Sequence, residues 1–187
     1  FIGFSAGNGV SGQSTGGSNT AVGREAAAGL TTGVSNSALG YRAGYGLTTG
    51  HSNVLLGLEN ALTLSIGQYN TTIGQQALYS EDVGNFTTAL GYRAGYSQNS
   101  DSNNEDTGNT LLGAGAGFYN VTGTGNTLVG RQAGNGASSN SYSNATAVGH
   151  KAGYSLTTGG ITAFGHQAGY SSTTGGGVHI GYQAGYS

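Results

Sequence analysis

Residues 36–45 read Asn-Ser-Ala-Leu-Gly-Tyr-Arg-Ala-Gly-Tyr, and the pattern returns as Asn-Thr-Thr-Ile-Gly-Gln-Gln-Ala-Leu-Tyr at 70–79 and Asn-Thr-Leu-Val-Gly-Arg-Gln-Ala-Gly-Asn at 126–135. Each copy has an apolar residue, then a Gly that we call the anchor, then an Ala three positions later. Eleven copies follow one another, with anchors 16 to 22 residues apart and most often 17. A fixed period of this length predicts a repeat architecture.

Three positions are nearly constant relative to the anchor. The residue before it is apolar in every copy, and we predict a core column there. Ala follows it by three residues in every copy except at Asn60, which indicates a buried position with room for a methyl group. The predicted core column is Val22, Leu39, Leu56, Ile73, Leu90, Leu112, Val129, Val148, Phe164 and Ile180.

Glycine and asparagine also stand at fixed positions, where we expect turns with positive φ. The predicted turn glycines are the anchors Gly23, Gly40, Gly57, Gly74, Gly91, Gly113, Gly130, Gly149, Gly165 and Gly181. The asparagines, four residues before the anchor, are Asn19, Asn36, Asn53, Asn70, Asn109 and Asn126.

A helix is disfavoured because each copy would place two or more glycines inside it, each costing about 1 kcal/mol relative to Ala. Short runs rich in Thr and β-branched residues favour strands instead. We predict an all-β fold, a β-solenoid. Each coil would hold a strand before the anchor, a second short strand around the Ala, and a Thr-Thr-Gly turn such as 47–50. Stacking eleven coils at about 4.8 Å gives a rod of roughly 50 Å.

Oligomerisation follows from the strand pattern. Successive strand residues point to opposite faces, and here both faces are apolar, as in Ala38 with Leu39. A coil of about 17 residues has one narrow interior and buries only one face. We therefore predict a homo-oligomer, with an intertwined homotrimer preferred.

Composition excludes several function classes. Only 12 of 187 side chains are charged, the formal net charge is −2, and the five Lys and Arg are scattered, so nucleic-acid binding is not expected. The 35% hydrophobic content argues against disorder, and the lack of Cys removes disulfides and thiolate metal sites. No run of 18 apolar residues occurs, so no membrane insertion is predicted for this segment, and no cofactor is predicted.

The three quoted units resemble the NTAxGxxAG(Y) shaft repeats of phage tail fibres. Similar repeats occur in bacterial surface proteins that carry a fibre chaperone, and the units are related to the head repeats of trimeric autotransporter adhesins. The resemblance covers the whole chain. It implies a trimeric, left-handed parallel β-roll with an architectural or attachment role at a virion or bacterial cell surface, hence an extracellular location.

We therefore expect residues 1–187 to be a single solenoid domain, an internal fragment of a longer fibre. The favoured function is a structural shaft segment that gives reach and stiffness for attachment. The alternative is the head or stalk of a bacterial trimeric adhesin that binds a cell-surface glycan or protein receptor. An ice-binding solenoid is disfavoured because the Thr-Thr pairs lie in turns and the repeat spacing is irregular.

No enzyme is expected, because the only neighbouring carboxylates, Glu81 with Asp82 and the 101–106 group, fall in linkers between coils. The longest copy carries an insertion near 98–108 with the oxygen-bearing residues Asp101, Asn103, Glu105 and Asp106. Such residues are Ca²⁺ ligand types, but their spacing fits no calcium loop, so a solvated loop is favoured.

Aromatic and imidazole rings recur at two positions after the anchor. His150 and His166 should stack about 5 Å apart; a metal or pH-sensitive pair is conceivable, and ordinary membership of an outer column is favoured. Tyrosines five residues after the anchor should stack and cover a seam between chains, with a sugar-binding strip as the alternative. The aromatics singled out are Tyr45, Tyr96, Tyr154, Tyr170 and Tyr186.

Overall fold

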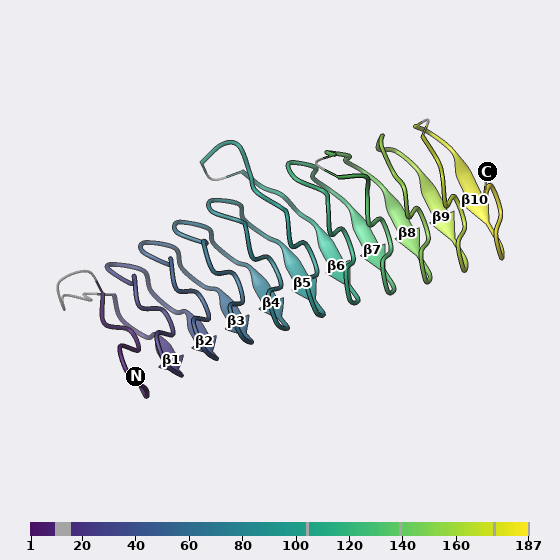
Figure 1. Ribbon diagram of the computed structural model, residues 1–187. Coiled ribbons are helices and arrows are strands. Elements are labelled where there is room, and N and C mark those ends of the chain that lie inside the picture. The colour runs from purple at the N-terminus through teal and green to yellow at the C-terminus, as the bar shows by residue number, and fades with distance from the viewer. Residues whose placement is uncertain (10–15, 104, 139, 174, 187) are drawn as a thin grey trace.

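The computed structural model describes residues 1–9, 16–103, 105–138, 140–173 and 175–186. In these ranges ten three-residue strands form one parallel sheet in chain order, and no helix occurs (Figure 1). The strands are β1 (Thr20–Val22), β2 (Ser37–Leu39), β3 (Val54–Leu56), β4 (Thr71–Ile73), β5 (Thr88–Leu90), β6 (Thr110–Leu112), β7 (Thr127–Val129), β8 (Thr146–Val148), β9 (Thr162–Phe164) and β10 (Val178–Ile180). The all-β parallel solenoid predicted from the repeat is confirmed.

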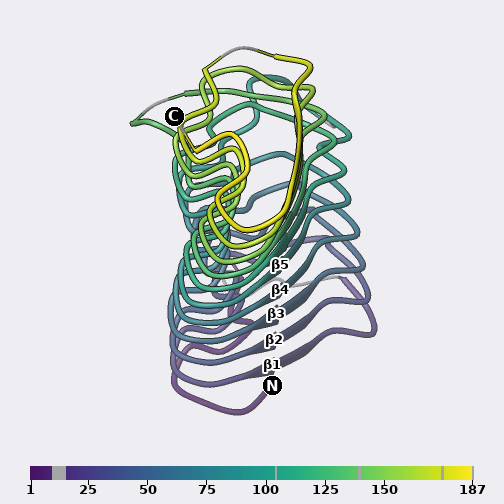
Figure 2. The same ribbon diagram turned by 90° about the vertical axis from the view of Figure 1, so that its right-hand side faces the viewer.

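Irregular repeat length does not disturb the sheet. Corresponding residues pair in register across every neighbouring pair of strands, including β5 and β6, whose anchors are 22 residues apart. The extra residues lie in the loop between these strands, which projects beyond its neighbours in Figure 1. Viewed from the end, the coils stack around a common interior (Figure 2). At the N-terminal end, Ile2 forms only an isolated bridge to Val22.

The prediction of a second strand around the Ala is wrong. Residues after each anchor form tight turns, with φ of +54° at Arg42 and +59° at Gly44, which no β-strand can contain. The turns still bond from coil to coil, since Arg42 N donates to Arg24 O at 3.0 Å and Gly44 N donates to Asn60 O at 2.9 Å. Backbone groups are thus satisfied between coils without strand geometry.

The anchor glycines behave as predicted, with φ between +125° and +139° at all ten predicted positions. A Cβ on Gly57 would lie 2.5 Å from the carbonyl oxygen of Gly74, so a side chain is excluded by the next coil as well as by φ.

The asparagines have a different role from the one predicted. They do not adopt positive φ; their side chains bond from coil to coil, and all except the partly buried Asn19 are buried. Asn53 donates from its backbone N and from Nδ2 to Asn36 Oδ1 at 3.1 and 3.0 Å. Its Nδ2 also donates to Gly67 O at 2.8 Å. Each amide thereby satisfies backbone groups of the coils beside it.

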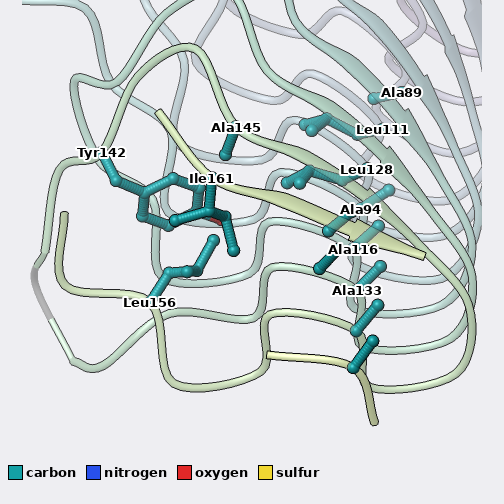
Figure 3. Packing of buried hydrophobic residues seen from close by; sticks show 14 of the residues in the cluster. Ala89, Ala94, Leu111, Ala116, Leu128, Ala133, Tyr142, Ala145, Leu156 and Ile161 are labelled. Carbon is teal, nitrogen blue, oxygen red and sulfur yellow. The ribbon is translucent and has the colours of Figure 1, made fainter. Parts of the chain in front are cut away.

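The interior is filled by the middle residues of β1 to β9 and by the predicted Ala column (Figure 3). Ala38, Leu55 and Ala43 are fully or almost fully buried. Tyr142 also lies inside, and its hydroxyl donates to Gly134 O. Burial raises the pKa of this phenol, so it stays protonated.

The predicted core column is wrong for the single chain, because its residues point outward from the sheet. Leu39 is 51% exposed and Phe164 42%. The middle residue points inward whether it is Ala38 or Leu128, and strand alternation then sends the residue before the anchor outward. Exposed members are Leu39, Ile73, Leu90, Leu112, Phe164 and Ile180; Val22, Leu56, Val129 and Val148 are partly exposed.

Candidate functional site

The outer face of the sheet is the most extensive candidate surface. It carries the ten residues once expected in the core, which we call the outer aliphatic row, at one position per strand. Because every strand pair is in register, for example Leu39 beside Leu56 and Leu90 beside Leu112, the row runs along the rod at the strand spacing of about 4.8 Å. An exposed apolar strip of this length is unusual on a soluble monomer.

A row of threonines runs beside the aliphatic one, two residues earlier in each strand. Its members pair directly from β4 to β9 and are Thr71, Thr88, Thr110, Thr127, Thr146 and Thr162. The Thr-Thr pairs of the turns and the unequal repeat length predict no such regular row. The loops absorb that inequality, so this row is regular.

Aromatic rings form ladders on the flank after the anchors, as predicted. Tyr170 stacks on Tyr154 and on Tyr186 with centroids 4.9 Å apart in both cases. Tyr96 stacks on Tyr79 at 5.0 Å, and Tyr45 lies under the guanidinium of Arg42 at 5.2 Å. The stacked rings thus contact the coil before or after their own, which stabilises the stack of coils, whereas Tyr45 contacts an arginine of its own turn.

The two histidines lie at the expected spacing, with ring centroids 5.1 Å apart, but their planes are tilted by 51° and are not parallel. Tyr182 continues the column on His166 at 5.1 Å. Burial, then the neighbouring His166, Arg131 and Lys151, lowers the pKa of His150. Across the described residues no group of three His, Cys, Asp or Glu side chains is placed to hold a metal ion. The pair fits the favoured interpretation, ordinary members of an outer column.

The acidic insertion does not form a ligand cluster in the described part of the chain. Asp101, Asn103 and Asp106 are exposed, whereas Glu105 is partly buried. Burial first, then the charges of Asp101 and Glu81, raises the pKa of Glu105. Asn85 N donates to Glu105 O at 2.8 Å, so the loop is attached to the solenoid by its backbone.

Glu81, which the sequence places in a linker between coils, has a fully buried side chain. Its Oε1 accepts from the backbone N of Val83, Gly84 and Ser100 at 3.1, 2.8 and 3.2 Å. Its Oε2 accepts from Gln98 Nε2 and Ser100 Oγ, both at 3.1 Å. Five donors satisfy the carboxylate, which makes it a structural group with no vacant position for a substrate.

The sequence held a signal for this burial. Glu81 stands seven residues after its anchor, where Leu47 and Leu64 stand in two earlier coils, and both leucines are fully buried. The position seven residues after the anchor therefore lies at a corner of the coil interior whatever its residue type, and we call it the interior corner.

No protein-family model, curated protein or solved structure matches this chain. No helix in the described residues is long and apolar enough to span a bilayer. Function therefore has to be argued from the surfaces themselves.

Proposed function

We propose that the chain is a structural shaft segment of a homotrimeric extracellular or virion fibre, in which about eleven left-handed coils per chain give reach and stiffness. The observation that carries the proposal is the outer aliphatic row. The interior of the coil is already filled by the Ala column and the middle strand residues, so this row cannot be buried by its own chain.

A second and a third copy of the same chain are the partners that fit the row best. Identical copies have the same coil spacing, so a contact made by Leu90 repeats at Leu112 and along the whole rod. Covering the row also removes exposed Leu, Ile and Phe side chains from water, at about 25 cal/mol per Å². The resemblance to tail-fibre shaft repeats supports the same arrangement.

The test is the mass of the purified chain in solution. Native mass spectrometry and light scattering should give three times the 18.5 kDa of one chain. Leu90→Glu with Leu112→Glu should dissociate the trimer, since charges would then be buried between chains. Gln75→Glu adds a charge at an exposed position off the row and serves as control. A monomeric wild-type chain at micromolar concentration contradicts the proposal.

The threonine row favours ice binding as a second candidate. Six hydroxyls at one spacing on a rigid sheet can order a layer of water, but only if the face is free of partner chains. Ice binding would be established in place of the shaft function by two results together. The chain would be a monomer that inhibits ice recrystallisation, and the double variant Thr110→Lys with Thr127→Lys would lose this effect. A trimer without such activity excludes it.

A further inference from the structure

The flank after the anchors carries two unusually small residues in one coil. The first and second residues after most anchors are long, as in Tyr92 with Arg93 and in the pair at 131–132. After Gly113 they are Ala114 and Gly115, which form the floor of a hollow of about 210 Å³. Its walls are Tyr92, Arg93, Phe118, Arg131, Gln132 and Asn135.

A second interruption lies next to the first. The aromatic ladder five residues after the anchor runs through Tyr96 and Phe118, with centroids 5.0 Å apart, and is broken by Asn135 before Tyr154. The break leaves a second hollow of about 180 Å³, which shares Phe118, Gln132 and Asn135 with the first. The two hollows are therefore contiguous.

The backbone conformation does not require the small residue at position 115. Gly115 has φ of +67°, but Arg93, Gln132 and Lys151 hold the same position in other coils with φ of +54°, +57° and +56°. A Cβ on Gly115 would lie 3.5 Å from Gln132 Cγ, an ordinary contact. A side chain would fit here as it does elsewhere in the flank, so the hollow is a feature of the surface and not a requirement of the fold.

The charge at the hollow is positive and unpaired. Arg93 and Arg131 flank it, and no carboxylate lines either hollow. Within the described ranges the ion pairs are those of Glu25 with Arg24 and Arg42, and neither flanking arginine takes part in one. Arg93 Nε donates to Gln76 Oε1 at 2.8 Å, and its guanidinium lies over Tyr92 at 5.1 Å, which holds it in place. A positioned guanidinium suits a carboxylate.

The rest of the wall suits a sugar ring. Tyr92 is 49% exposed, and Phe118 lies between the two hollows, so aromatic surface is available to the C–H face of a pyranose. The amides of Gln132 and Asn135 can bond hydroxyl groups. Each hollow is smaller than the roughly 300–1,000 Å³ of drug-sized pockets, which fits one monosaccharide unit in each.

We propose that the contiguous hollows between Tyr92 and Tyr154 bind an acidic saccharide, with the carboxylate of a uronic-acid type sugar between Arg93 and Arg131. The site would give an otherwise architectural rod an adhesive function. It lies on side chains after the anchor, whereas the outer aliphatic row lies before it, so the two proposals are tested separately.

The probe pair is methyl β-D-glucuronide and methyl β-D-glucoside, which differ only by the carboxylate at C6. Saturation-transfer NMR on the full chain should show binding of the glucuronide and at least fivefold weaker binding of the glucoside. Gly115→Gln, which places on the floor the residue found at position 132, should weaken glucuronide binding at least fivefold. Arg131→Gln should do the same by removing the charge.

Gln167→Ala changes the same position in a distant coil and should leave binding unchanged. Thermal denaturation must show that Gly115→Gln keeps the wild-type fold; if it does not, Arg131→Gln at the exposed rim decides the result. Equal binding of both sugars, no saturation transfer at millimolar glucuronide, or wild-type binding by both variants would overturn the proposal.

Discussion

The first coils, those of β1 to β3, and the middle coils, those of β4 and β5, have strands in the same register but different side chains at one corner of the interior. Seven residues after the anchor, the first coils bury Leu30, Leu47 and Leu64, whereas the middle coils bury Glu81 and Gln98. Strand pairing is in register throughout. The anchor glycines, the Ala column and the strands therefore determine the coil, and the corner accepts a polar side chain when its polar atoms are hydrogen-bonded.

The boundary between the two regions is itself polar. Asn60 replaces the Ala of its column and Thr72 replaces the apolar middle residue of β4, and Thr72 Oγ1 donates to Asn60 Oδ1. The buried apolar side chains form two separate clusters on either side of this pair, one ending at Leu64 and the other starting at Ala77. The two departures from the repeat are thus the two halves of one buried hydrogen-bonded pair.

The largest effect is expected when a middle coil receives the leucine that the first coils have at this corner. Glu81→Leu leaves five buried donors without their acceptor, and each unsatisfied donor costs about 1–3 kcal/mol. We expect the free energy of unfolding to fall by more than about 4 kcal/mol in urea titrations. A loss below about 1 kcal/mol would mean that the network rearranges freely, and the comparison would fail.

The next effect tests the leucine corner. Leu47→Ala should cost about 2–5 kcal/mol, because the stacked coils above and below limit collapse of the cavity. Leu58→Ala is the matched control, since this leucine is 42% exposed on the flank and its truncation should change stability by less than about 0.5 kcal/mol. Equal losses at the two positions would show that the corner is not part of the core.

A smaller effect should come from removing the boundary. Asn60→Ala or Thr72→Ala alone should cost about 1–2 kcal/mol, since each leaves a buried polar partner unsatisfied. The double variant restores the residues found in neighbouring coils, such as Ala43 and Ala89, and should lie within about 1 kcal/mol of wild type. Additive losses in this double-mutant cycle would contradict the pairing.

How much of this the sequence could predict depends on the residue. Anchors such as Gly57 were predictable because every copy has Gly there and a Cβ would meet the next coil. The Ala column was predictable because every copy except that of Asn60 keeps it. The direction of the strand residues was not, since in a pair such as Leu111 and Leu112 both residues are the same and their type does not say which one is buried.

The turn after the anchor was equally beyond prediction. Arg42 and Gln76 adopt left-handed backbone, which their residue types disfavour; coil-to-coil hydrogen bonds such as Gln76 N to Leu58 O at 2.9 Å stabilise it. The hollow at Gly115 depends on what neighbouring coils place beside it, which a single repeat does not show. Tertiary context therefore decided both features.

The smallest expected effect is a difference between the two regions in how stability depends on pH. In the first coils Glu25 accepts from Arg42 Nε at 2.5 Å, and this bond holds the pKa of Glu25 below its usual range. In the middle region burial raises the pKa of Glu105. A lowered carboxyl pKa contributes stability above the unfolded-state value, and that contribution is lost as pH falls through the folded-state pKa. A raised pKa has the opposite sign: stability falls as pH rises from the unfolded-state value through the folded-state pKa.

Thermal midpoints measured between pH 3 and pH 7 for Glu25→Gln and Glu105→Gln should therefore diverge from wild type in opposite directions. Glu25→Gln should lose less stability than wild type on acidification, because it has no ion pair to lose. Glu105→Gln should be stabilised relative to wild type at pH 7, where the buried carboxyl is penalised, and the gain should disappear at acid pH. Parallel profiles for the two variants would mean that both carboxyls are solvated alike, and that the electrostatic contrast between the regions is absent.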